Sequence, residues 1–100
     1  MRKTPISNPI ANMDLINIDR HRQTRNVSAL LGAPYRVENE VWACPVELRG
    51  FEPQYPDIQG EGAMQALGLA LGFLRQRLGN LLDQGEIFYV LGDEEVLDRA

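Results

Sequence analysis

The segment that decides the fold is GAMQALGLALGFLRQRLGNLL, residues 62–82. Leucines recur through it at spacings of four and three residues, at positions 67, 71, 74, 78 and 81. This spacing follows the period of an α-helix, so it predicts one helix about 30 Å long with a leucine stripe along one side. Gly85 lies just beyond the segment and is a typical helix stop.

Three glycines, Gly68, Gly72 and Gly79, each follow a leucine of this stripe. A glycine inside a helix costs ~1 kcal/mol relative to alanine, so three of them require an offsetting benefit. The interpretation we favour is close approach of another backbone, either the sheet beneath the helix or a helix of a second subunit. The three glycines are therefore interface candidates. A membrane-dimer motif is excluded because Arg75 and Arg77 interrupt the apolar run.

The strongest strand prediction is VWACPVELRG, residues 41–50. Apolar side chains alternate along it, which places four residues on one face of a strand over 41–48: Trp42, Cys44, Val46 and Leu48. Pro45 falls on the other face and cannot donate a ladder hydrogen bond, so it belongs at an edge or at a position whose N–H would point outward.

Further strands are predicted at 13–23, 26–31 and 86–91, while residues 51–59 form either a loop or a short irregular strand. Asp93 is the expected N-cap of one or two helical turns over 94–99. Strands that precede a helix favour an α+β fold. We therefore expect an antiparallel sheet of three to five strands with the helix packed on one face, and a short C-terminal strand and helical turn.

Residues 1–11 carry two prolines and no clear periodicity, so we expect a flexible N-terminal arm, followed by a single α+β domain over 12–100. The opposite sheet face is expected to be uncovered, which favours a homodimer or a docking surface. The apolar alternation predicts this core: Ile16, Ile18, Val27, Leu31, Trp42, Cys44, Val46, Leu48, Leu67, Leu71, Leu74, Leu78 and Phe88.

Two motifs, WACP at 42–45 and QALGLAL at 65–71, carry a family resemblance. The chain resembles a family of small bacterial domains of unknown function with a Trp-x-Cys-Pro strand and a Gln-Ala-Leu-x-Leu-Ala-Leu helix. The likeness covers residues 13–82. It implies a compact strand-rich unit with a long helix and implies no activity. Family members often carry an Asp cap where this chain has Gly62, so any role of that Asp is not carried over.

Composition points to one ordinary globular domain, because the chain has 100 residues, 44% of them hydrophobic and 24% charged. The single cysteine excludes an internal disulfide, and a reducing, cytoplasmic compartment is expected. No apolar secretory segment follows the first residues, and the longest nearly uncharged stretch, 62–74, is too short to span a bilayer.

The net charge of −4 is unevenly distributed. Residues 1–50 hold 7 Arg or Lys against 5 Asp or Glu, a balance of +2, whereas residues 51–100 hold 3 against 9, a balance of −6. Nucleic-acid binding requires concentrated positive charge, so no nucleic-acid partner is expected.

Cys44 invites two interpretations, a reactive thiol or an apolar filler beside Trp42. A nucleophilic cysteine needs a nearby imidazole, cation or helix N-terminus. The only imidazole is His21, on a different predicted strand. Because the alternation puts Cys44 on an apolar face, we interpret it as a core residue. One Cys and one His cannot form a structural zinc site, and the acidic run at 93–98 is interpreted as a solvated tail.

The segment DRHRQTR, residues 19–25, concentrates Arg20, His21, Arg22 and Arg25. It is either a site for an anion or acidic partner, or an exposed strand edge whose charges discourage aggregation. We favour the second interpretation.

Two functional classes follow, and neither assigns a catalytic residue, a metal or a cofactor. The favoured one is a non-enzymatic protein-interaction or homodimerising module, with no membrane partner. The alternative is a small-molecule domain that binds an anionic ligand with a basic edge and a Trp-lined pocket, through Arg20, His21, Arg22, Arg25, Trp42 and Cys44.

Overall fold

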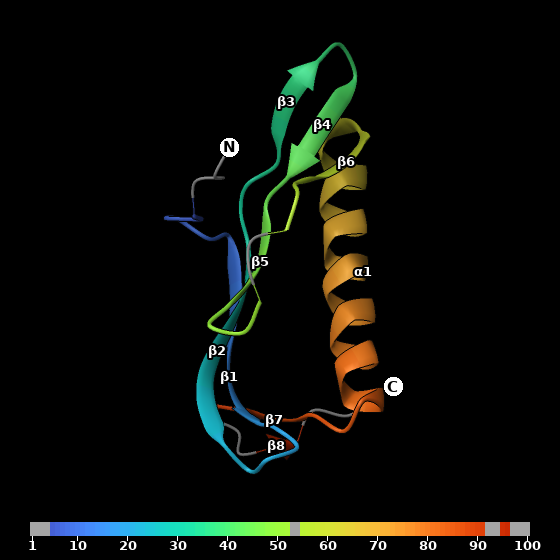
Figure 1. Cartoon of the computed structure of the whole chain (residues 1–100). Helices are drawn as coiled ribbons and strands as arrows, with labels where there is room; N and C mark the ends of the chain where they lie inside the picture. Colours follow the sequence, from blue (N-terminus) through green and yellow to red (C-terminus); the bar gives the residue numbers. More distant parts are fainter. Residues whose placement is uncertain (1–4, 53–54, 92–94, 97–100) are drawn as a thin grey trace.

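The computed structural model describes residues 5–52, 55–91 and 95–96, and it confirms the α+β class. Two antiparallel sheets have the strand orders β5-β2-β1-β7-β8 and β3-β4-β6, and one long helix packs against both (Figure 1). The elements are β1 (Ala11–Ile18), β2 (Thr24–Leu31), β3 (Tyr35–Glu38), β4 (Val41–Cys44), β5 (Val46–Arg49), β6 (Ile58–Glu61), α1 (Gly62–Asp83), β7 (Ile87–Val90) and β8 (Glu95–Val96).

Pro45 divides the strand that was predicted over 41–48. The residues before it form β4 in the three-stranded sheet, and the residues after it form β5 in the five-stranded sheet. The prediction of one continuous strand is therefore wrong, because a proline cannot donate a ladder hydrogen bond. Its carbonyl still accepts the N–H of Gly32 at 3.0 Å. A Cβ on Gly32 would lie only 3.0 Å from the Pro45 ring, so glycine suits this crossing.

The face of β1 that packs into the core is the opposite of the predicted face. Leu15 and Asn17 are fully buried, whereas Ile16 and Ile18 are only half-buried on the other face. Apolar residues occur at both odd-numbered and even-numbered positions of this strand, so alternation alone does not decide which face packs into the core. The Asn17 amide is accommodated in the core because its nitrogen donates to the Glu86 carboxylate and to the Ile87 carbonyl, each at 3.1 Å.

The strand also ends earlier than predicted, at Ile18 instead of Gln23. Asp19 ends it, because its carboxylate accepts the backbone N–H groups of His21 at 2.8 Å and Gln23 at 2.9 Å. Such side-chain bonds compete with the sheet ladder and favour a turn.

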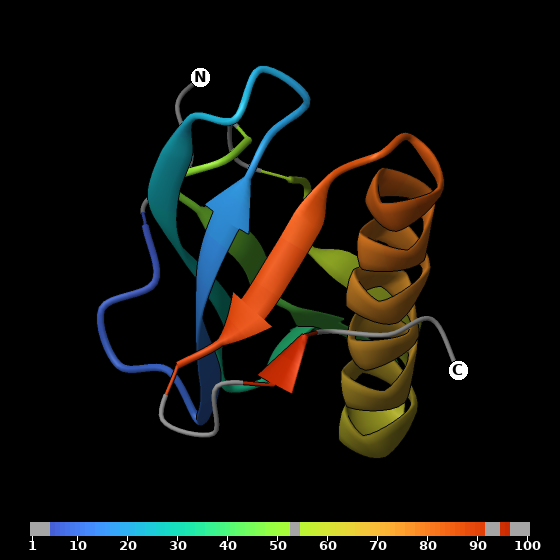
Figure 2. The ribbon, with the colours of Figure 1, turned by 90° about the horizontal axis from the view of Figure 1, so that it is seen from below.

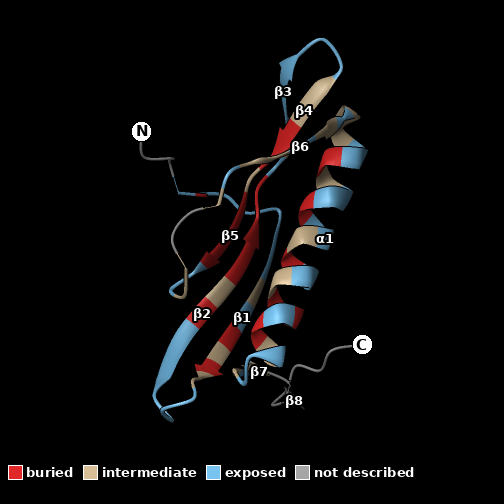
Figure 3. Cartoon of the chain, turned by 45° about the vertical axis from the view of Figure 1, so that its right-hand side comes forward, coloured by how far each residue is buried: buried red, intermediate tan, exposed pale blue. Residues whose placement is uncertain are grey.

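α1 runs along one side of both sheets, with residues 5–10 on the opposite side (Figure 2). Its buried line includes Ala66, Ala70, Leu74, Leu78 and Leu81, visible as the red side of the helix in Figure 3. This line is rotated from the leucine stripe that was predicted to face the core. Alanines replace leucines at its first turns because β6 approaches closely there: a Cβ on Gly60 would lie 2.9 Å from the Ala66 nitrogen.

The predicted core is confirmed in most of its members and wrong in a few. Val27, Leu31, Cys44, Val46, Leu48, Leu74, Leu78 and Phe88 belong to the buried cluster, and Trp42 and Leu67 pack against it from the side. The prediction was wrong for Leu71, which is 47% exposed, and for Ile16 and Ile18, as described above.

Residues 5–10 lie against the outer face of the five-stranded sheet. Ile6 is buried there, its N–H donates to the Glu47 carboxylate, and its carbonyl accepts from Arg49 at 2.7 Å. Further along, the N–H of Ile10 donates to the Leu31 carbonyl at 2.8 Å. This part of the segment that was expected to be a loose arm is therefore bound to the sheet, while residues 1–4 lie outside the described part of the chain.

Two segments that the sequence left open or misassigned are strands. Ile58–Glu61 forms β6, so the end of the segment 51–59 is a strand. Glu95–Val96 forms β8, paired with β7, so the prediction of a helix at these two positions is wrong. The expected cap at position 93 and the rest of the predicted turn, at 94 and 97–99, lie outside the described residues.

Candidate functional site

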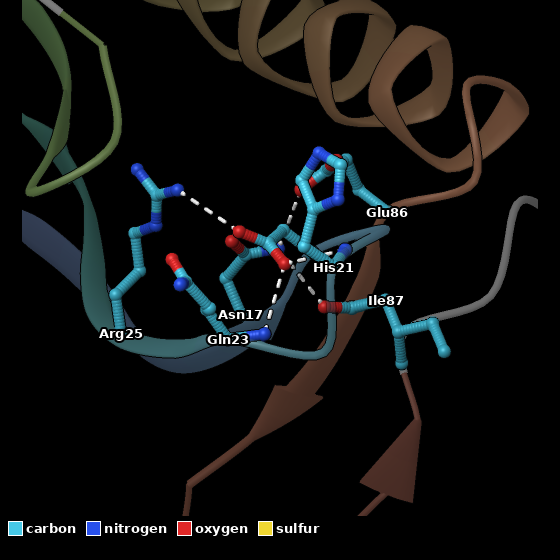
Figure 4. A network of polar contacts seen from close by, with 7 residues as sticks. Asn17, His21, Gln23, Arg25, Glu86 and Ile87 are labelled. Carbon is cyan, nitrogen blue, oxygen red and sulfur yellow. Dashed lines mark hydrogen bonds and ion pairs between the residues drawn. The ribbon is translucent and has the colours of Figure 1, made fainter.

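The predicted basic residues lie in and beside the β1–β2 turn, at the end of the molecule away from the β3–β4 hairpin (Figure 1). Arg20, His21 and Arg22 are exposed, and Arg22 adopts a φ of 63° in this turn. The Asp19 carboxylate organises the turn, because it accepts the backbone N–H groups of His21 and Gln23, both of which are labelled in Figure 4. Hydrogen bonds from the backbone N–H groups of Gln23 and His21 hold the pKa of the Asp19 carboxyl below its usual range.

Arg25 is engaged in packing. Its guanidinium lies 5.1 Å from the centroid of the Phe51 ring, and one of its nitrogens lies 3.6 Å from the Asp19 carboxylate. Phe51 in turn meets Phe88 with ring centroids 5.8 Å apart. Arg25 therefore helps to hold the segment after β5 over the inner face of the sheet.

Cys44 is fully buried, and its thiol lies 3.3 Å from the Gly32 carbonyl. Cys44 lies far from His21, so the thiol and the only imidazole of the chain are not neighbours. Val46, two residues after Cys44, pairs with Leu31 at one end of β2, whereas His21 precedes the other end. The seven-residue step along β2 corresponds to about 23 Å at 3.3 Å per residue.

The burial of Cys44 gives a prediction for native protein at neutral pH. Thiol labelling should proceed only through unfolding, and therefore at least about a thousandfold more slowly than labelling in denaturant. Stopped-flow measurement with a chromogenic disulfide reagent tests this rate. Fast modification of native protein would show that Cys44 is accessible and would restore its interpretation as a reactive thiol.

Trp42 lines a shallow depression of about 360 Å³ at the start of α1, together with Arg36, Asn39, Glu40, Glu61 and Gly62. The Arg36 side chain donates to the Asn39 carbonyl at 2.7 Å, and the two carboxylates oppose a bound anion. The structure thus places the Trp42 depression and the basic turn at separate positions. The six residues of the predicted ligand site do not form one pocket.

A polar clamp that the sequence analysis missed joins the segment after β5 to α1. Arg77 donates twice to the Glu52 carboxylate, through Nε and Nη2, each at 2.6 Å, and the Tyr55 hydroxyl donates to the same carboxylate. Hydrogen bonding from Arg77 lowers the pKa of Glu52, whereas burial, followed by the bond to Glu52, raises the pKa of Tyr55. Because 25 residues separate Glu52 from Arg77, no local sequence pattern predicts this clamp.

The outward side of α1 presents a second surface, which we call the outer α1 face: Met64, Gly68, Leu71, Gly72 and Arg75. All five residues are exposed. Met64 is 82% exposed and Leu71 47%. A Cβ added to Gly68 or Gly72 would meet nothing within 4 Å. Close approach of the chain's own sheet therefore does not explain these two glycines. Gly79 differs from them because it is buried.

Residues 5–52, 55–91 and 95–96 contain no cluster of three or more His, Cys, Asp or Glu residues suited to hold a metal ion. Within the same residues, no helix combines the length and apolar character that a membrane crossing requires.

Comparison with protein-family models, with curated proteins and with solved structures found no match for this chain. The resemblance to small bacterial domains therefore stays a prediction.

Proposed function

We propose that the protein is an interaction module that contacts another polypeptide through the outer α1 face, with self-association as its first expected mode. The observation that carries this proposal is the pair Gly68 and Gly72. They lie in the interior of a helix, they are exposed, and a Cβ added to either would meet nothing within 4 Å beyond the adjoining turns of the helix itself.

Each glycine costs ~1 kcal/mol relative to alanine in a helix, and an exposed alanine would fit at both positions. A glycine pair four residues apart lets a second backbone approach a helix closely, which offers a benefit that the isolated chain does not provide. Met64 and Leu71 flank the pair with exposed apolar side chains, which gain from being covered.

The substitution Gly72→Leu tests this surface. We expect it to weaken association at least about tenfold, because the leucine fills the space that the partner's backbone occupies. The melting temperature of the monomer should stay the same or rise, since nothing in the chain opposes the new side chain and leucine favours helix. Sedimentation velocity over a concentration series measures the first quantity, and circular dichroism at low concentration measures the second.

Asn80→Leu is the matched control, because it adds the same side chain at an exposed position of α1 more than one turn beyond Arg75, the last residue of the outer α1 face. It should leave association unchanged. Equal association of both variants and the wild type would contradict the proposed surface, and so would a wild-type protein that stays monomeric at every concentration.

A further inference from the structure

The outer face of β5 carries a small site that binds the main chain of residue 6. The Ile6 N–H donates to the Glu47 carboxylate, and the Ile6 carbonyl accepts from Arg49 at 2.7 Å. Arg49 also donates to Glu47, through Nε at 3.2 Å and Nη2 at 3.1 Å. The Glu47 side chain is only 7% exposed. A nearly buried carboxylate and a guanidinium are therefore held together, and they bind both main-chain polar groups of one residue.

The segment that fills this site, residues 5–10, is anchored mainly by one side chain. Among these six residues only Ile6 is buried, and residues 7–9 make no hydrogen bond with any residue that the structure describes. A depression of about 410 Å³ remains between the segment and the crossing at Gly32 and Pro45. Because ordering each residue costs conformational entropy, a segment with one buried side chain is only marginally bound to its sheet.

The chain between Ile6 and β1 folds back on itself to reach the site. It bends at residues 7, 8 and 10, and the Ile10 N–H then donates to the Leu31 carbonyl at 2.8 Å, beside the first pair of the β1–β2 ladder. Pro9 favours an extended conformation for Asn8, the residue that precedes it. An extended connection leads the segment away from its own sheet, so this sequence favours the folded-back form less than a flexible one would.

We propose that residues 5–10 of a second copy occupy the site on β5, so that two copies exchange these segments around a two-fold axis. Ile6 of each copy then contacts Glu47 and Arg49 of the other. The occupant is a second copy because the fit of this segment to the site is observed directly within one chain. The same contacts form again between two chains, so the exchanged form is favoured as the protein concentration rises.

The length of the connection limits how the two copies can lie. The four steps from Ile10 to Ile6 span about 14 Å when extended, so the starts of the two β1 strands have to lie close together. The site on β5 shares no residue with the outer α1 face. Segment exchange is therefore a second contact surface beyond the proposed function, and it does not depend on that function.

Paramagnetic broadening between two copies tests the exchange. One copy carries a maleimide spin label on Asn8→Cys, an exposed position that lines the same depression as Gly32, while Cys44 is buried and stays unlabelled. The other copy is wild type and enriched in heavy nitrogen. Equal amounts are unfolded together in urea and refolded at high concentration, so that slow exchange reaches equilibrium. Full exchange gives half of the enriched copies a labelled segment, so their Gly32 amide signal should fall about twofold.

Ile6→Asp on the spin-labelled copy is the matched control, because it places a carboxylate beside Glu47 and removes the apolar anchor. It should restore the full Gly32 signal, while circular dichroism shows a folded chain. A Gly32 signal that is unchanged in the first mixture, or broadening that survives Ile6→Asp, overturns segment exchange. Neither result bears on the outer α1 face, because Gly72→Leu tests that surface by sedimentation and should leave the broadening in place.

Discussion

Gly50→Ala should lower the free energy of unfolding by about 3 kcal/mol or more, which is one of the two largest effects that we expect. Two features of the structure combine at Gly50. Its φ is +87°, in the left-handed region, and a Cβ added there would lie 2.4 Å from the Asn26 carbonyl oxygen. That oxygen belongs to the backbone of β2, so neither side can give way without distorting the sheet.

The position matters because the chain leaves β5 at Gly50 and turns over the inner face of the sheet. The N–H groups of Phe51 and Glu52 both point back to the Leu48 carbonyl, at 3.3 Å and 3.2 Å. The turn delivers Phe51 to Phe88 and Glu52 to Arg77. Loss of the turn therefore weakens both contacts together.

Gly62→Ala is the control for backbone strain, because Gly62 shares a positive φ of +80° but an added Cβ there meets nothing within 4 Å. It should cost only about 1 kcal/mol. Urea unfolding of both variants measures the difference. If Gly50→Ala were no more destabilising than Gly62→Ala, the contact with Asn26 would not contribute, and our description of this turn would be wrong.

Arg77→Met should lower the free energy of unfolding at pH 7 by about 2 kcal/mol. The substitution keeps the apolar stem of the side chain and removes both donors to Glu52, whose carboxylate side chain is only 21% exposed. The charge then stays partly buried with the Tyr55 hydroxyl as its remaining donor in the clamp. The double variant Glu52→Gln/Arg77→Met removes the uncompensated charge as well, so it should recover part of the loss.

The same clamp has a pH dependence whose sign follows from the lowered pKa of Glu52. A group with a depressed pKa in the folded state stabilises the protein above its unfolded pKa, about 4.3 for Glu, and loses this contribution as the pH falls through the folded value. The difference between wild type and Arg77→Met should therefore shrink below about pH 4. A difference that is constant from pH 7 to pH 3 would contradict the assignment to the Glu52 charge.

The sequence predicts the helix and its extent well, because a strong 3.6-residue period extends from residue 62 to residue 82 and the observed helix is Gly62–Asp83. It predicts the rotation of that helix less well. Leucines mark the apolar side, yet Ala66 and Ala70 form the contact where β6 comes close. Leu71 lies on the exposed side, because the close contact between α1 and β6 favours small side chains such as alanine over larger apolar ones.

Strand pairing shows the same limit. Alternation over 41–48 places the right residues in the core, but it does not reveal that Pro45 transfers the chain from one sheet to the other. The clamp of Glu52 and Arg77 depends on tertiary pairing alone, so it is invisible in the sequence. The interface candidates Gly68 and Gly72 could be chosen from the sequence, since an unexplained helix glycine is a local signal. Their exposure required the structure.

The most direct test of the central claim is whether the outer α1 face becomes covered when copies of the chain associate. A spin label on Arg75→Cys sits at an exposed position of this face, while Cys44 is buried and stays unlabelled in native protein. Electron paramagnetic resonance should show a mobile label in dilute protein and an immobilised label in concentrated protein. A label that is equally mobile at every concentration would contradict contact through the outer α1 face.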